Sequence, residues 1–258
     1  MILCINIQRK MTLEEEIIQF LKDKGYRVTE EIRDSVERLE EMTVAAQNKD
    51  DVTDVLRWLE EERKKYPAKV SEVGINELDK WHVDPKNGWI AHESGRFFQI
   101  VGIRVEGAGN REVTSWTQPM MKQNECGILG VICKKINGVR HYLLNAKFEP
   151  GNNPNLQLSP ALQATESNLK LVHGGKKPPL AEYFEGGENG KVVYSAVGVE
   201  DGGRFYLKTN RSVLVEVDEN EDVKTPEGFI WLTLPQIKKL LRMDNVVNSL
   251  AREVFALL

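Results

Sequence analysis

The sequence has little that would mark a secreted, metal-binding or membrane protein. Its three cysteines, Cys4, Cys126 and Cys133, are odd in number and lack zinc-ligand spacing, which predicts reduced thiols in a cytoplasmic protein. The opening MILCINIQ is too short and too polar in its flanks for a signal peptide or a membrane span. The histidines at 82, 92 and 141 do not have the spacing of metal ligands. We therefore predict neither a metal site nor membrane association.

The chain also lacks an excess of positive charge. Its formal net charge is −4, which gives no general basic field and predicts no nucleic-acid binding. Hydrophobic residues make up 41% of the 258 positions and charged residues 29%, as in ordinary globular proteins. A chain of this length can bury a sizeable core, as one large domain or one domain plus an appendage.

Proline is missing, and glycine almost missing, from residues 12–65, which are rich in Glu, Lys, Arg and Leu. Apolar residues at helical spacing predict three helices here, the first between an N-cap at Thr12 and a stop at Gly25, the third over 51–65. Their charged faces suit solvent, whereas their apolar stripes need a partner surface. We predict a helical N-terminal extension over residues 1–70, at or near the interface of a homodimer.

Beyond this extension, short β-like runs alternate with Gly, Asn and Pro. The predicted strands lie at residues 96–105, 128–136, 140–146, 191–197 and 212–217. Asn137-Gly138 is a strong hairpin signal between two of them. Helical periodicity returns at the end of the chain, with one helix starting at Leu234 and a second predicted over residues 245–257. The fold class predicted for residues 71–258 is α+β.

The stretch from residue 116 to residue 205 has the density of Gly, Pro, Asn, Gln and lone charges expected of a functional site. Together with its flanks it resembles the NDP-hexose 2,3-dehydratases, lyases that remove water from nucleotide-linked 4-keto-6-deoxy sugars. The matching residues are, in order, HESGRFF at 92–98 with Gly102, WTQP at 116–119, Leu144, Ala146, Lys147, EPGN at 149–152, QLSP at 157–160, QAT at 163–165, Ser167, Asn168, Gly174, Gly175, Glu200, Arg204, Phe205, Asn210 and Arg211. This ordered set is more specific than any single short motif.

The resemblance implies a Nudix-like fold, a mixed β-sheet flanked by helices. Nudix hydrolases carry a GX5EX7REUXEEXGU box whose glutamates hold metal, and the chain has no such box. That argues against pyrophosphate hydrolysis and against a required divalent ion. Family members typically carry two copies of the module in one polypeptide, whereas this chain matches one. Either two chains associate to reproduce that arrangement, or a single module suffices.

The resemblance also implies a reaction of deoxysugar biosynthesis on a nucleotide sugar, most simply a dTDP-linked one. The 4-keto group acidifies the hydrogen on C3, so a base can form an enolate that expels the C2 hydroxyl. The product is a 3,4-diketo-2,6-dideoxy sugar. No cofactor is needed, because the ketone itself is the electron sink. The protein must supply a base, donors for the enolate oxygen, an acid for the leaving hydroxyl, and contacts to the diphosphate.

Three residues are candidates for these proton transfers. Glu149 follows a predicted strand and precedes Pro150-Gly151, which suits a side chain held at the edge of a pocket. Such a carboxylate can equally accept backbone N–H bonds that shape the turn. His173 precedes a diglycine that lets a ligand approach, although a lone loop histidine is more often surface. Tyr206 could donate a proton to the leaving hydroxyl, or be half-buried packing.

Positive charge for the diphosphate or the enolate is expected from Lys147, Arg204 and Arg211, each of which could instead form a surface ion pair. Further residues expected to contact the substrate are Trp116, Gln118, Asn152, Gln157, Gln163, Thr165, Ser167, Asn168, Gly174, Gly175 and Asn210. The alternative for the polar members is satisfying backbone groups in a long loop, and for the tryptophan it is core packing.

Two other functions remain open. The chain could be a nucleotide-sugar-binding module without turnover, or one half of a multi-chain enzyme. A Nudix-type hydrolase is the weaker alternative because the metal-binding box is missing.

Overall fold

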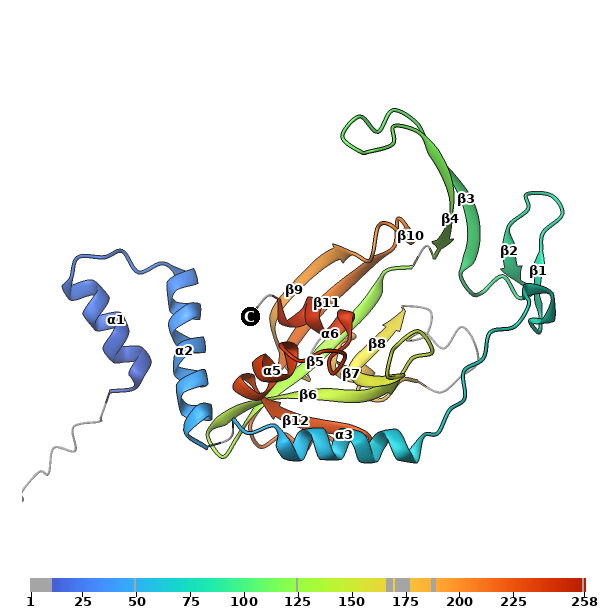
Figure 1. The fold of residues 1–258 in the computed structure, drawn as a ribbon. Coiled ribbons are helices and arrows are strands. Elements are labelled where there is room, and N and C mark those ends of the chain that lie inside the picture. The colour runs from blue at the N-terminus through green and yellow to red at the C-terminus, as the bar shows by residue number, and fades with distance from the viewer. Residues whose placement is uncertain are drawn as a thin grey trace, which may run out of the picture.

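The computed structural model describes residues 11–48, 50–123, 125–165, 169, 177–186, 189–256 and 258 (Figure 1). The helices are α1 (Leu13–Asp23), α2 (Glu30–Asn48), α3 (Thr53–Lys65), α5 (Leu234–Leu241) and α6 (Ser249–Phe255), with 3-10 turns η1 (Ile75–Glu77) and η2 (Ala181–Tyr183). The strands are β1 (Trp81–Val83), β2 (Ile90–His92), β3 (Gln99–Val105), β4 (Trp116–Lys122), β5 (Gly127–Ile136), β6 (Val139–Phe148), β7 (Leu156–Pro160), β8 (Leu162–Thr165), β9 (Lys191–Val199), β10 (Phe205–Tyr206), β11 (Thr209–Glu216) and β12 (Phe229–Thr233).

The larger sheet has the strand order β12-β6-β5-β11-β9 and mixes parallel and antiparallel pairs. The predicted hairpin is confirmed: Asn137 and Gly138 both have positive φ, 53° and 78°, as a two-residue turn between antiparallel strands requires. Beyond the pair Ile132–Leu143 the two hairpin strands separate. There β6 pairs with β7 and β5 pairs with β8, so the sheet opens into a fork.

Helices cover one face of this sheet. A single core cluster joins Leu129 and Leu144 of the sheet to Leu59 of α3, Ile237 of α5 and Val254 of α6. Part of the opposite face is covered by Leu180, Tyr183 and Phe184, which lie in and around η2 and pack against strand residues such as Leu143 and Val213. The predicted α+β class, a mixed sheet flanked by helices, is confirmed. Within the described part of the chain, no helix is both long enough and apolar enough to cross a membrane.

The helices of the N-terminal extension begin where the sequence predicts. Thr12 caps α1 through a capping box with Glu15. The apolar stripes find partners within the chain: Ile18 and Ala45 are buried, and Leu59 of α3 belongs to the main core. The division of the chain near residue 70 stays a prediction.

A partly buried ionic cluster also joins α2 to the sheet. Arg140 of β6 lies 3.0 Å from Glu37, 3.6 Å from Glu41 and 2.8 Å from Glu216, and Tyr142 donates to Glu41 at 3.0 Å. Burial raises the pKa of Glu41, opposed by the hydrogen bond from Tyr142 and by the charge of Arg140. These groups explain why α2 keeps a fixed position beside β6.

The last helix begins later than predicted, at Ser249 rather than residue 245. Val247 forms a parallel bridge with Leu158 of β7, and the backbone N–H of Leu158 donates to Val246. Asn248 then caps α6 by accepting from the N–H of Ala251 at 2.8 Å. Sheet pairing therefore overrides the helical periodicity of these residues.

A smaller sheet, of order β1-β2-β3-β4-β10, extends from the body (Figure 1). The hairpin of β3 and β4 curves away from the larger sheet, and β10 pairs with β4 in parallel. Of the cysteines predicted to be reduced, Cys126 and Cys133 are free, and Cys4 lies outside the described residues. Burial raises the pKa of Cys133 to about 12, which makes it an inert core thiol.

Candidate functional site

A cavity of about 280 Å³ lies beside the fork of the larger sheet. We call it the fork cavity, and it is lined by Gln123, Gly127, Ile128, Leu129, Lys147, Gln163, Ala164, Thr165, Glu200, Phe205, Lys208, Asn210 and Leu250. Polar side chains reach it from both arms of the fork and from β11. Long-range pairing thus brings Lys147, Gln163, Thr165 and Asn210, four predicted site residues, to one place.

Glu149 adjoins the cavity at the end of β6. Its Oε1 accepts from Gln163 at 2.9 Å and lies 3.9 Å from Nζ of Lys147. Its Oε2 accepts from Asn152 at 3.1 Å and from Asn248 at 3.3 Å. Three side-chain amides and one ammonium group therefore fix this carboxylate, which contacts the cavity wall through Gln163 and Lys147.

Two lysines bring positive charge to the cavity. Burial lowers the pKa of Lys147, and the carboxylate of Glu149 opposes that effect. Lys208 is only 3% exposed, and its Nζ donates to the carbonyl of Glu125 at 2.6 Å. Burial lowers the pKa of Lys208 too, opposed by Glu200. Both ammonium groups lose hydration on burial. An anionic ligand in the cavity would compensate for that loss by pairing with them.

Glu200 supplies the carboxylate that lines the cavity directly. It follows β9, and its Oε2 accepts from Asn210 at 3.0 Å. Asn210 is buried and comes from the start of β11. Glu149 and Glu200 thus approach the cavity from different strands, which gives the site two carboxylates with separate neighbours.

Gly127 makes room for this arrangement, so Gly127→Ala is expected to lower both stability and ligand binding. A Cβ atom there would overlap Oδ1 of Asn210 and lie 3.6 Å from Nζ of Lys208. Overpacking of this kind costs about 1–3 kcal/mol of unfolding free energy. Urea unfolding measures the loss, with Gly102→Ala on β3 as the matched control, because a Cβ atom there meets nothing within 4 Å. Equal stability of the two variants would contradict the packing argument.

Asn152 and Gln157 lie close to this site without lining the cavity. Asn152 donates to Glu149, as described above, and Gln157 is buried opposite Lys147 in the pairing of β6 with β7. Ser167, Asn168, His173, Gly174 and Gly175 lie outside the described residues.

Other predicted residues lie around β4 and β10. Trp116 donates to Gln118 at 2.7 Å, and Gln118 donates to the carbonyl of Gly203 at 2.9 Å. The side chain of Arg204 is 81% exposed and pairs with Asp201. Tyr206 is exposed on β10. The neighbouring Phe205, by contrast, lines the fork cavity.

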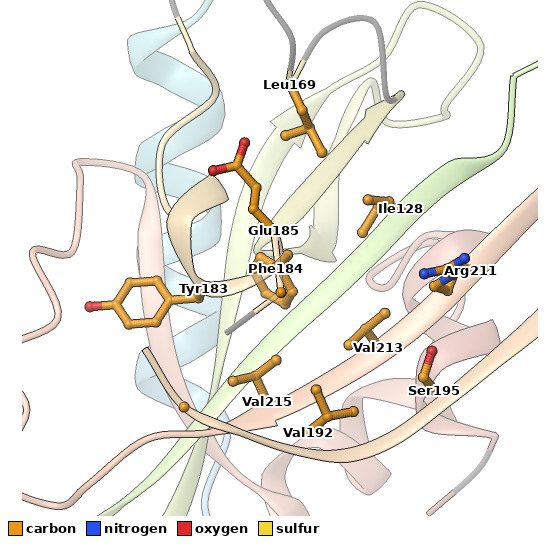
Figure 2. Close-up of a pocket in the computed structure, with 12 residues that line it drawn as sticks. Ile128, Leu169, Tyr183, Phe184, Glu185, Val192, Ser195, Arg211, Val213 and Val215 are labelled. Atoms are coloured by element: carbon orange, nitrogen blue, oxygen red, sulfur yellow. The ribbon is translucent and has the colours of Figure 1, made fainter. Parts of the chain in front are cut away.

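Arg211 lies in a different cavity, of about 430 Å³, that also contains Phe184, Ser195 and Val213 (Figure 2). Successive residues of a strand point to opposite faces of the sheet, so Arg211 is directed away from its neighbour Asn210. The walls are mainly valine, isoleucine and aromatic side chains, and Arg211 supplies the one positive charge among the described residues that line it.

Lys208 and Gln123 line the fork cavity but were not among the candidates drawn from the sequence. Lys208, Asn210 and Ser212 are buried at alternate positions, a period-two pattern of polar residues on one face of a strand. The residues between them, Thr209 and Arg211, are polar too, so the sequence itself shows no alternation that identifies Lys208. Within the described residues, no group of three or more His, Cys, Asp or Glu side chains could hold a metal ion.

The fold and the cavity define a mixed α+β protein with two carboxylates and two lysines gathered at a fork in its sheet. The chain belongs to the NDP-hexose 2,3-dehydratase family, whose model matches residues 52–258. This membership confirms the resemblance found in the sequence.

Curated relatives are 2,3-dehydratases by name. A dTDP-4-dehydro-6-deoxy-alpha-D-glucopyranose 2,3-dehydratase of Saccharopolyspora spinosa is 41% identical over 199 residues, which is 77% of this chain and 40% of the relative. One of Amycolatopsis orientalis is 40% identical over 210 residues, 80% of this chain and 44% of the relative. The chain therefore spans less than half the length of these relatives.

Solved structures with some likeness include an Ap4A hydrolase of C. elegans, 15% identical with a TM-score of 0.35, covering 52% of this chain and 98% of the other. Another is a Nudix hydrolase of M. smegmatis, 15% identical with a TM-score of 0.33, covering 60% and 97%. Likeness at this level is too distant to carry an argument about the reaction.

Proposed function

We propose that the chain binds a nucleotide-linked 4-keto-6-deoxyhexose, with dTDP as the nucleotide, in the fork cavity and removes water across C2 and C3. The observation that supports this proposal is the convergence of Glu200, Lys147 and Lys208 on one cavity, with the carboxylate of Glu149 hydrogen-bonded to Gln163 of its wall, in a chain of the 2,3-dehydratase family. The carboxylates suit proton transfer, and the lysines suit the enolate oxygen and the diphosphate.

The reaction needs a base at C3 and an acid at the C2 hydroxyl. In this proposal Glu149 removes the C3 proton, and Lys147, 3.9 Å away, stabilises the negative charge that develops on the C4 oxygen. His173 and Tyr206 remain proposed partners in proton transfer. Of the two, Tyr206 extends from β10 on an exposed side chain, so it would reach the cavity only by moving.

The diphosphate is proposed to lie against Lys208, whose neighbour Asn210 can donate to a sugar or phosphate oxygen. Gln163 and Thr165 line the wall where sugar hydroxyls would bind. Arg204 and Arg211 were proposed for the same task. Arg204 is held by Asp201 and Arg211 faces the other cavity, so the two lysines carry the proposal.

The test is incubation of the purified chain with dTDP-4-keto-6-deoxyglucose in D2O, without added metal or nicotinamide. We expect loss of water and deuterium at C2, both followed by NMR, because the enol product takes its new proton from solvent. Binding without turnover would favour the binding-module alternative and contradict the proposed reaction. Release of a nucleoside monophosphate would instead indicate a hydrolase.

Assembly and location are also proposals. We propose a homodimer, since one module per chain would then be paired, and a cytoplasmic location, which suits the free thiols at Cys126 and Cys133. The division into a helical extension over residues 1–70 and a dehydratase module over 71–258 is proposed in the same way.

A further inference from the structure

Strand β9 ends the larger sheet, and its outer edge has no partner strand among the described residues. One edge of β9 pairs with β11 from Lys191 to Val199. The other edge leaves a row of backbone N–H and C=O groups without a strand to pair with. An edge of this kind is a template for another chain, unless charged residues, prolines or short length protect it.

The side chains of β9 lack that protection. No charged residue or proline occurs between Lys191 and Glu200. Four valines of the strand are widely exposed: Val192 at 55%, Val193 at 42%, Val197 at 60% and Val199 at 67%. Leu207, 76% exposed, lies near the Val199 end of the strand, because the N–H of the next residue, Glu200, donates to the carbonyl of Lys208. Together these five apolar residues form the β9 patch, an exposed surface of the kind that marks an interface.

We propose that β9 pairs antiparallel with β9 of a second copy of this chain. This inference deepens the proposed homodimer by naming its surface. A two-fold axis brings the same strand edge of each copy together, so the exposed valines of one β9 would pack beside those of the other across the new strand pair. The charges at the strand ends favour this direction: antiparallel pairing sets the Lys191 end of one strand near the Glu200 end of the other, whereas parallel pairing would bring like charges together.

The N-terminal helices have less need of a partner than β9 does. Ile18, Val36 and Ala45, from the stripes of α1 and α2, are already buried within the chain. Three apolar residues of these helices are exposed: Phe20 on α1 at 58%, and Leu39 and Val44 on α2 at 51% and 37%. Lys24 lies over the Phe20 ring, and Glu40 and Glu41 stand beside or one turn before the other two, as is common for exposed apolar residues. The structure therefore assigns the interface to β9 rather than to the N-terminal extension.

The interface would lie next to the fork cavity without entering it. Glu200 follows directly on β9, and Asn210 pairs with Gly198 in the β9–β11 register. Pairing of β9 would therefore stabilise the strand that leads directly to Glu200, the carboxylate that lines the fork cavity. Val197 and Val199, by contrast, are not among the residues that line the fork cavity.

Light scattering of the full chain at micromolar concentration tests the proposal. We expect wild type at twice the 29.4 kDa chain mass and the double variant Val197→Lys, Val199→Lys at the single mass. Both positions are exposed, so the lysines should cost little folding stability, and an unchanged circular dichroism spectrum would confirm it. The control is Leu39→Lys, a 51% exposed apolar position on α2, which we expect to stay dimeric.

Hydrogen exchange supplies a second readout that does not depend on the variants. In the dimer the outward amides of β9 should be protected, and dilution to monomer should remove that protection. A wild-type monomer, or a dimer dissociated by Leu39→Lys and not by the β9 variant, would overturn the proposal. Protected β9 amides in a monomer would overturn it as well, because another segment of the same chain would then cover the edge. None of these outcomes depends on turnover, so failure of the dehydratase assay leaves the interface test intact.

Discussion

Replacing Glu149 by glutamine is expected to lower kcat about 10²- to 10⁴-fold, the usual contribution of a positioned general base, while the chain stays folded. The side chain keeps its size and its neighbours but loses the ability to take a proton. Turnover of the 4-keto sugar, followed by NMR, measures the effect. Binding of dTDP should change little, because Lys208, which contacts the diphosphate in the proposed complex, is untouched.

Glu149 could instead serve to shape the turn, and the hydrogen bonds around it allow the glutamine variant to test that role. A glutamine keeps one oxygen for Asn152 and Asn248 and presents an amide group to Gln163. Oε1 of Gln163 is buried and has no hydrogen-bond partner in the part of the chain that the structure describes. A flip of the Gln163 amide would therefore let it accept from the new group, so all three contacts can persist. We expect the melting temperature to stay within a few degrees of wild type, in line with a ΔΔG below about 1 kcal/mol.

Two further variants separate the possible assignments. Glu200→Gln changes the carboxylate that lines the fork cavity directly, and Glu185→Gln changes one that lines the cavity around Arg211. If Glu149→Gln retained wild-type kcat while Glu200→Gln lost it, the base would be Glu200. A loss confined to Glu185→Gln would move the reaction to the other cavity. A large drop in melting temperature for Glu149→Gln would leave only the structural role.

The local elements of this fold could be predicted from the sequence because their signals are local. The Thr12 cap, the Asn137-Gly138 hairpin and the helix beginning at Leu234 depend on residues within a few positions of each other. The predicted strands fall within β3, β5, β6, β9 and β11, apart from their ends. Helical periodicity wrongly placed residues 245–248 in the last helix, because the residue with which they pair, Leu158, is some ninety positions away in the sequence.

The candidate site was predictable in part. Lys147, Gln163, Thr165 and Asn210 were candidates, and the fork brings them to one cavity. No sequence pattern predicts the fork itself, since it requires β5 and β6 to exchange partners for β7 and β8 midway along their length. Arg211 was a candidate for the same site as Asn210, but neighbouring residues on a strand face opposite sides of the sheet. Lys208 was overlooked because a lysine in a turn is most often on the surface.

Replacing Lys208 by methionine is expected to weaken binding of dTDP about 10- to 100-fold, since a hydrogen bond between charged groups contributes about 1.5–3 kcal/mol. Methionine keeps the apolar stem of the side chain and removes the charge that faces the cavity. Isothermal titration calorimetry with dTDP measures the change. Lys224→Met is the matched control, because Lys224 is exposed and pairs with Asp222 outside the cavity, and it should bind as wild type does.

The pH dependence of binding gives the same proposal a second test. Only the ammonium form of Lys208 attracts the diphosphate, and only the ammonium form of Lys147 adds to the positive potential of the cavity. Burial lowers both pKa values below the ordinary 10.5. Affinity should therefore be complete near neutral pH and fall as the pH rises through the lowered pKa, earlier than for an exposed lysine. Lys147→Arg should bind better than wild type at high pH, because arginine stays charged there. Affinity that is independent of pH up to 10.5, together with unchanged binding by Lys208→Met, would place the diphosphate outside the fork cavity.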